Sequence, residues 1–121
     1  MTTIEDQTAQ TLAAVARFSD AFDRHDVDGV MAAMSADCVF ESTGPAPDGD
    51  RYVGAAAVRE FWDQFFRNNP TAMFVTEEQF AAADRCVVRW RYEWRSGHVR
   101  GIDLFRVRDS VVTEKVCYVK G

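Results

Sequence analysis

The stretch CVVRWRYEWRSGHVRGIDLFRVR, residues 86–108, alternates between apolar or aromatic side chains and charged ones. A two-residue period of this kind is typical of β-strands whose two faces meet different surroundings. In its first half, one face carries the apolar and ring residues Cys86, Val88, Trp90, Tyr92 and Trp94. The other face carries Val87, Arg89, Arg91, Glu93 and Arg95. Because Ser96-Gly97 is a turn signal, the stretch predicts two hairpin-linked strands whose ring-bearing face turns toward the rest of the chain.

Similar runs lie on both sides of this hairpin. Four strands are expected in the C-terminal half, at residues 72–81, 86–96, 98–108 and 111–120. Short polar segments separate them, Ala83-Asp84-Arg85 on one side and Arg108-Asp109-Ser110 on the other, and these predict tight turns. Strands joined by such short connections pair in antiparallel fashion.

The N-terminal half has a different period, with apolar residues at three- and four-residue steps. This pattern predicts a helix over residues 4–24, a short helix after a cap at Asp26, and a third helix over 55–68. Between the last two, residues 38–42 have strand character, and 43–50 form a loop with two prolines. Helices followed by hairpin-linked strands predict one α+β domain over residues 1–121, with three helices on one face of a curved antiparallel sheet.

The composition and net charge limit the kinds of molecule that the chain is expected to bind. The chain has 121 residues, 47% of them hydrophobic and 12% aromatic, and a formal net charge of −5. An acidic chain repels phosphate groups, so neither nucleic acid nor a membrane surface is an expected partner. The three cysteines are far apart and follow no metal-binding spacing, so we expect free thiols, no metal and no cofactor. The polar N-terminus and the lack of a roughly 18-residue apolar run favour a cytoplasmic location.

The last two strands decide which polar groups face the interior. In one, Gly101, Asp103, Phe105 and Val107 share a face. In the other, Val112, Glu114, Val116 and Tyr118 are opposed by Val111, Thr113, Lys115, Cys117 and Val119. If Phe105 and Tyr118 face inward with the tryptophans, Asp103 and Glu114 do so too. Two carboxyl groups in an aromatic interior could then divide acid and base roles. The alternatives are a bulge near Asp109-Ser110, which would turn Glu114 outward, and a pairing of Glu114 with an arginine.

Three segments carry a resemblance to a known family. They are RFSDAFDRHDVDGVMAAMSADCVFE at residues 17–41, YVGAAAVREFWDQFF at 52–66, and GIDLFRVRDSVVTEKVCYVKG at 101–121. Their order and spacing resemble the NTF2-like superfamily, and within it the SnoaL-like and ketosteroid-isomerase-like branch. The resemblance implies a cone-shaped, cystatin-like α+β fold with an apolar pocket between helices and sheet, and a dimer formed through the outer sheet face.

The resemblance also assigns roles to single positions. Ketosteroid isomerase uses an aspartate base with an oxyanion hole made of a tyrosine and a protonated aspartate. The resemblance aligns Asp103 with that protonated aspartate, Phe18 with the tyrosine and Ser42 with the base. The neighbouring Glu41 points to the other face of its strand, and Trp62 lies at a pocket position that is often tyrosine. Because two of the three catalytic groups are absent, ketosteroid isomerase activity itself is not expected.

These observations favour a small-molecule site. The residues expected to act on a substrate are Asp103, Glu114 and Tyr118. The residues expected to line the pocket are Phe18, Phe40, Ser42, Trp62, Phe65, Trp90 and Trp94. The favoured interpretation is a cofactor-independent acid–base enzyme, of isomerase, cyclase or hydrolase type, acting on an apolar polycyclic or lipid-like substrate. The alternatives are a non-catalytic binder that uses the same pocket and a protein-interaction module that uses the outer sheet face.

The outer sheet face itself is expected to be an interface. Ile102, Leu104, Val111 and Cys117 are assigned to it. Apolar residues gathered on one exposed face of a small domain favour association, and a second copy of the chain is the simplest partner. The sequence therefore predicts a homodimer.

Overall fold

The structure, a computed structural model, describes residues 2–120 and contains three helices and six strands in that range. In chain order the elements are α1 (Ile4–Asp23), α2 (Val27–Ala32), β1 (Met34–Glu41), β2 (Arg51–Val53), α3 (Ala55–Asn68), β3 (Met73–Ala82), β4 (Arg85–Trp94), β5 (Gly97–Arg108) and β6 (Val111–Val119). The predicted helices and the four C-terminal strands are all present, within one to three residues of their expected ends. None of the helices in this range is long and apolar enough to cross a membrane.

Local signals explain where the helices begin. At the start of α1, Thr3 and Asp6 form a capping box in which each side chain accepts a hydrogen bond from the other residue's backbone N–H. The expected cap of α2 is also found, because the Asp26 carboxylate accepts a hydrogen bond of 3.0 Å from the Gly29 backbone N–H. Helix α3 follows Gly54, whose φ of 91° lies in the region that favours glycine.

The six strands form one sheet in the order β2-β1-β6-β5-β4-β3. Four of the five pairings are antiparallel, as predicted, but β1 and β6 run parallel. The expected antiparallel sheet is therefore mixed, because the last strand of the chain pairs in parallel with the first. The strand expected at 38–42 is also longer, and the three-residue strand β2 was missed because it is too short to show a period.

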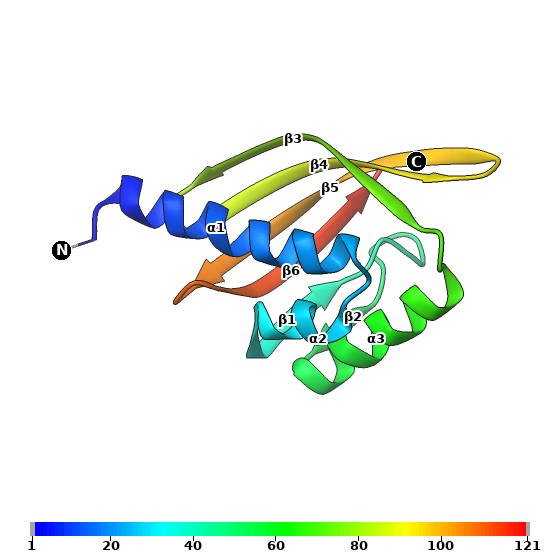
Figure 1. Cartoon of the computed structure of the whole chain (residues 1–121), viewed down its shortest axis with the longest axis horizontal. Helices are drawn as coiled ribbons and strands as arrows, with labels where there is room; N and C mark the ends of the chain where they lie inside the picture. The colour runs from blue at the N-terminus through cyan, green and yellow to red at the C-terminus, as the bar shows by residue number, and fades with distance from the viewer. Residues whose placement is uncertain (1, 121) are drawn as a thin grey trace.

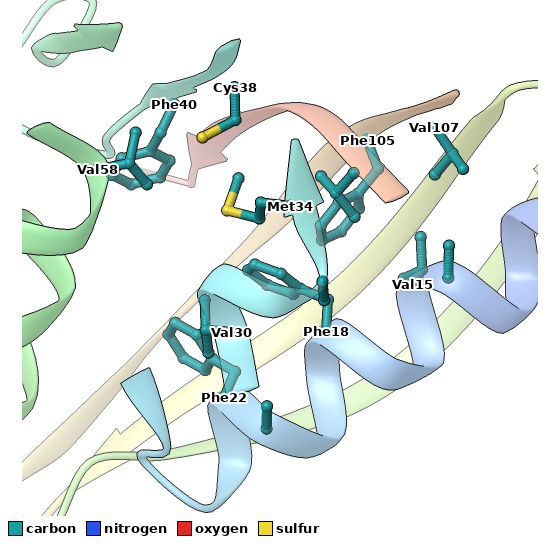
Figure 2. Packing of buried hydrophobic residues seen from close by; sticks show 14 of the residues in the cluster. Val15, Phe18, Phe22, Val30, Met34, Cys38, Phe40, Val58, Phe105 and Val107 are labelled. Carbon is teal, nitrogen blue, oxygen red and sulfur yellow. The ribbon is translucent and has the colours of Figure 1, made fainter. Parts of the chain in front are cut away.

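The helices lie on one face of the curved sheet. Helix α1 crosses the concave face over β3 to β6, whereas α2 and α3 lie at the end near β1 and β2 (Figure 1). The β4–β5 hairpin extends beyond the end of α1 (Figure 1). Between the layers, Val15, Phe18 and Phe22 of α1 meet residues of β1 and β5, among them Phe40 and Phe105 (Figure 2). This cluster is the hydrophobic core, and it forms the base of the space between helices and sheet.

A bulge in β6 determines which of its residues face the core. Arg106 pairs with Glu114, but the next residue, Val107, pairs with Val112, so Thr113 is an extra residue on β6. Because side chains alternate, the extra residue keeps Val112 buried while reversing every later position. Lys115 is therefore buried, at 5% relative exposure. The structure therefore has the alternative arrangement, in which a bulge turns Glu114 outward.

The assignments of Glu114, Lys115 and the later residues of this strand are consequently wrong, and three of them concern expected site or interface residues. Glu114 lies across from Arg106 on the outer face, and Tyr118, paired with Ile102, is 57% exposed. Neither side chain faces the interior. Cys117, assigned to the outer face, instead pairs with Asp103 on the concave side.

The convex face of the sheet carries an apolar line across four strands. Phe80, Val87, Leu104 and Val116 are successive cross-strand partners on β3, β4, β5 and β6. We call these four residues the outer apolar row. Phe80 is 57% exposed, and the other three are half-buried. Ion pairs lie on both sides of the row, Arg89 with Glu77 and Glu78 on one side and Arg106 with Asp84 on the other.

Candidate functional site

A cavity of about 340 Å³ lies between the concave sheet face and helices α1 and α3. Its volume is at the lower end of the range of small-molecule sites. All seven residues expected to line a pocket do line it: Phe18, Phe40, Ser42, Trp62, Phe65, Trp90 and Trp94. The inward-facing residues of β4 and residues of α1 and α3 supply half of this wall, and the other strands of the sheet supply most of the rest. The cavity is therefore strongly aromatic.

One ion pair lies in the wall of this cavity. The Nζ atom of Lys115 is 3.5 Å from Oδ2 of Asp103, and the two side chains are only 6% and 14% exposed. Four aromatic rings surround the ammonium group, with centroids 4.9 to 5.8 Å from Nζ. They belong to Trp62, Phe40, Phe22 and Phe18. The faces of such rings attract a cation, so the rings and the carboxylate together stabilise a buried charge.

Lys115 is charged in this setting. Burial is the largest single influence and lowers the pKa of Lys115, but Asp103 and Cys117 together raise it by more, so the pKa of Lys115 lies above its ordinary value of 10.5. Its ammonium also donates a hydrogen bond of 3.3 Å to Sγ of Cys117. Burial raises the pKa of the Cys117 thiol to about 12, so this sulfur is a neutral thiol at physiological pH. Cys117 is thus a weak hydrogen-bonding partner and not a nucleophile.

Asp103 lies where the alternation of its strand predicts, on the concave face between Val88 and Cys117 of the neighbouring strands. Its Oδ2 atom meets Lys115, whereas its Oδ1 atom is buried with no hydrogen-bond partner among residues 2–120. The indole N–H groups of Trp62 and Trp90 are likewise buried without an acceptor in that range. Buried polar atoms are nearly always paired, so three without partners around one cavity indicate polar contacts that a ligand could complete.

Two further polar side chains line the cavity. Ser42 is buried in its wall, and the Ser42 hydroxyl donates a hydrogen bond of 2.7 Å to the Gly44 carbonyl and accepts one of 3.0 Å from the Asp50 N–H. The hydroxyl thus holds the loop after β1. Asp23, at the end of α1, lines the mouth of the cavity, where burial and the nearby charge of Asp20 raise its pKa although His25 opposes this.

The comparisons with known proteins agree with this geometry. The SnoaL-like domain matches residues 15–115, most of the chain. The chain belongs to the SnoaL-like domain family. No curated protein matches it.

Solved structures similar to this SnoaL-like domain share its whole fold. An NTF2-like protein of unknown function from Mesorhizobium loti is 40% identical, with 96% of this chain and 95% of that chain covered and a TM-score of 0.85. A candidate ketosteroid isomerase from Kribbella flavida is 16% identical, with 94% and 80% covered and a TM-score of 0.81. TerC, co-crystallised with polyporic acid, is 17% identical, with 92% of each chain covered and a TM-score of 0.77. The fold implied by the sequence resemblance, an NTF2-like or cystatin-like α+β fold, is confirmed.

Of the three residues expected to act on a substrate, this SnoaL-like domain places only Asp103 in the cavity wall. Glu114 and Tyr118 lie on the outer face and do not line the cavity. Glu41 is also turned away from the cavity, as expected, and its carboxylate accepts a hydrogen bond of 2.7 Å from Arg51. In residues 2–120, no group of three or more His, Cys, Asp or Glu side chains is placed to hold a metal ion.

Sequence reasoning missed two charged residues of the site. Lys115 was assigned to the outer face because the bulge that turns it inward leaves no clear pattern in VVTEK. One compositional signal existed, since the chain has only two lysines, Lys115 and Lys120, among its 14 basic residues. Asp23 was missed because it is the last residue of α1 and follows the polar face of the helix, which is expected to face solvent. It lies one turn after Ser19, and both line the cavity beside Phe22.

Proposed function

We propose that the SnoaL-like domain is a cofactor-independent acid–base enzyme that moves a proton on a small apolar ring compound bound in the aromatic cavity. The observation that carries this proposal is the position of Asp103. Its carboxyl group lies in the wall of a ring-lined cavity, 3.5 Å from a charged lysine, and one of its oxygen atoms has no hydrogen-bond partner within residues 2–120. A carboxylate at such a place can accept a proton from a bound ligand and return it to another atom.

The remaining wall supports the same chemistry. Phe18, Phe40, Trp62, Phe65 and Trp90 exclude water from the base of the cavity, which strengthens every charge interaction inside it. The flat faces of these rings suit a flat ligand with its own ring system. The free cysteines support a reducing compartment such as the cytoplasm.

Two similar structures favour a ligand of this class, although at their identities they share only the fold. TerC was crystallised with polyporic acid, and the protein from Kribbella flavida is named as a candidate ketosteroid isomerase. The present chain departs from ketosteroid isomerase at two positions. Phe18 has no hydroxyl to donate and packs against Phe105, and Ser42 holds a loop. We therefore propose proton transfer without ketosteroid isomerase specificity.

A second candidate function is non-catalytic binding of the same class of ligand. The ion pair itself favours it, because Asp103 already has a structural partner in Lys115. A carboxylate that only neutralises a buried lysine would occupy the same position. The two functions differ in whether a proton of the ligand exchanges.

Solvent exchange tests the proposal directly. The two-ring ketone 2-tetralone, incubated with the protein in deuterium oxide, should gain deuterium next to its carbonyl faster than in buffer, as followed by NMR. Asp103→Asn keeps the shape of the side chain but cannot carry the proton, so exchange should fall to the buffer rate. Because this variant also leaves Lys115 without its counter-ion, circular dichroism and retained binding of the ketone must show that it is folded. Glu114→Gln is the matched control, because this carboxylate lies on the outer face. Binding of the ketone without any Asp103-dependent exchange would favour the non-catalytic function.

A further inference from the structure

Lys115 has few partners for a buried ammonium group. It lines the cavity with a side-chain exposure of 6%. Its polar neighbours are Oδ2 of Asp103 at 3.5 Å, a long separation, and the neutral thiol of Cys117 at 3.3 Å. An ammonium group has three N–H donors, and a thiol is a weak acceptor. A charge this deeply buried is costly unless its donors are satisfied.

The aromatic rings around Lys115 do not accept conventional hydrogen bonds from its N–H groups, as oxygen atoms would. Phe18 and Phe22 come from α1, Phe40 from β1 and Trp62 from α3, and each lies within 6 Å of Nζ. They stabilise the positive charge through their faces and leave N–H capacity for an oxygen atom in the cavity. Lys115 is therefore held as a cation but incompletely hydrogen-bonded.

The charges around Lys115 limit what can bind beside it. Asp103 on β5 carries one negative charge and Cys117 on β6 carries none, so the ammonium and its surroundings are close to neutral together. Asp23 of α1 is the other acidic residue lining the cavity, and it is exposed at the mouth. A ligand that entered as an anion would add an unbalanced charge inside a ring-lined wall, which is unfavourable. A neutral ligand keeps the balance.

We propose that Lys115 binds the oxygen of a neutral ring compound, and that this oxygen replaces Asp103 as its counter-ion when the ligand proton moves to Asp103. The inference rests on the proposed function and names its substrate class, which is enolisable ring ketones and phenols, as opposed to carboxylic acids. The C–H or O–H bond of the ligand breaks, and its proton forms a bond to a carboxylate oxygen of Asp103. When an O–H bond breaks, its electron pair stays on the ligand oxygen beside Lys115 Nζ. When a C–H bond breaks, its electron pair forms a carbon–carbon double bond and the π pair of the carbonyl moves to that oxygen, so in neither case is anything oxidised or reduced.

Three probes of similar shape test the substrate class on the wild-type protein. They are 2-naphthol, naphthalene and 2-naphthoate. Because a hydrogen bond to a charged group is involved, 2-naphthol should bind about tenfold more tightly than naphthalene. The carboxylate 2-naphthoate should bind most weakly of the three. Bound 2-naphthol should also show the absorption of its anion at a pH where the free compound is neutral. Equal or tighter binding of 2-naphthoate would overturn the inference.

Variants then test whether Lys115 is responsible. Lys115→Met alone leaves Asp103 unpaired and could fail to fold, so the double variant Lys115→Met with Asp103→Asn removes both charges together. It should still bind naphthalene but lose both the preference for 2-naphthol and the anion spectrum. Lys120→Met is the matched control at an exposed lysine and should behave as wild type. A preference that survives in the double variant would overturn the inference.

The two proposals fail in different ways. If 2-tetralone exchanges in an Asp103-dependent manner but 2-naphthol has no advantage over naphthalene, the role of Lys115 is wrong and the proposed function stands. If the 2-naphthol preference depends on Lys115 but no ketone exchanges its protons, the cavity binds without catalysing, and the inferred transfer of a ligand proton during turnover is wrong. If neither naphthalene nor 2-naphthol binds, both proposals fall.

Discussion

Phe105 and Lys115 are direct cross-strand partners in the β5–β6 ladder, and both side chains are buried on the concave face. A lysine opposite a core phenylalanine is unusual, because an unpaired buried charge would be strongly unfavourable. It is tolerated here because Asp103, two residues before Phe105 on the same face, supplies the counter-ion. The pairing of β5 with β6 thus positions both a core phenylalanine and the charged residues of the site.

The first prediction concerns the stability of this pair. Lys115→Met leaves a buried carboxylate without its partner and should lower the free energy of unfolding by about 3–5 kcal/mol. Adding Asp103→Asn should recover part of the loss, because no unpaired charge then remains. Urea denaturation of the two single variants and the double variant measures this as a double-mutant cycle. Additive losses would show that the two groups do not interact.

The second prediction follows from the bulge at Thr113. Glu114 and Tyr118 lie on the outer face, so Glu114→Gln and Tyr118→Phe should each change stability by no more than about 0.5 kcal/mol. Both should leave binding of 2-naphthol unchanged, as measured by titration. A selective loss of binding in either variant would mean that β6 has the opposite register, with Lys115 turned outward.

Much of the fold could be predicted because its periods are clear. The third helix was expected at residues 55–68, where α3 is found, since Val58, Trp62 and Phe66 form a regular stripe. The ring-bearing face of β4 was likewise predicted to face inward, and Trp90 lies there in the cavity wall. In both cases one face of the element is apolar over several turns or pleats, so only one orientation of the element buries its apolar side chains.

The errors arose where this patterning is ambiguous. Val111 and Val112 are adjacent and both apolar, so the sequence does not show which of them begins the inward set of β6. The extra residue Thr113 then reverses the positions that follow. Lysine is among the residues least often buried, so composition also favoured an outward Lys115. The parallel pairing of β1 with β6 joins the first and the last strand of the sequence. Residues so far apart along the chain leave no local pattern that would predict their pairing.

The third prediction concerns alkaline pH. Burial raises the pKa of Cys86 to about 11 and that of Cys117 to about 12, from an ordinary value of 9.0. The folded state therefore keeps protons that the unfolded chain has already lost. Stability from these groups is fully present below pH 9.0 and is lost as the pH rises through their folded values. The raised pKa of Lys115 acts in the same direction above 10.5.

Urea midpoints measured from neutral to alkaline pH should consequently fall once the pH passes 9.0, the ordinary thiol value. Cys86→Ala should flatten this fall, since it removes one of the thiols that ionise only on unfolding. Asp37→Asn, at an exposed carboxylate whose pKa is lowered by the nearby Ser35 and Arg108 side chains, is a control that should leave the alkaline slope unchanged. A stability that stays constant through the alkaline range would contradict burial of the thiols.

The fourth prediction separates two tryptophans of the cavity. Trp62 is 2% exposed and packs against Phe22 and Phe40 as well as Lys115, so Trp62→Ala should cost about 3–5 kcal/mol. Trp94 is 45% exposed at the hairpin end of the cavity, so Trp94→Ala should cost little stability while weakening the binding of ring compounds. Thermal melts and titration with naphthalene measure the two effects. The reverse order would place Trp94 in the core.

The fifth prediction concerns the outer apolar row, through which we propose that two copies of the chain associate. The surface differs from the one expected, because Cys117 faces the cavity, whereas Leu104 lies in the row as assigned. Phe80 and its three partners form one line across four strands, bordered by ion pairs, and a two-fold axis could place two such lines against each other. Covering this surface removes apolar area from water.

Sedimentation at micromolar concentration should therefore show a dimer, and Leu104→Glu should convert it to a monomer, because each interface would then bury two carboxylates without partners. Ile4→Glu is the matched control, since Ile4 is 68% exposed but lies at the start of α1, away from the sheet face. Circular dichroism should show that both variants remain folded. A wild-type protein that sediments only as a monomer, or a Leu104→Glu variant that remains dimeric, would exclude the outer apolar row as the interface.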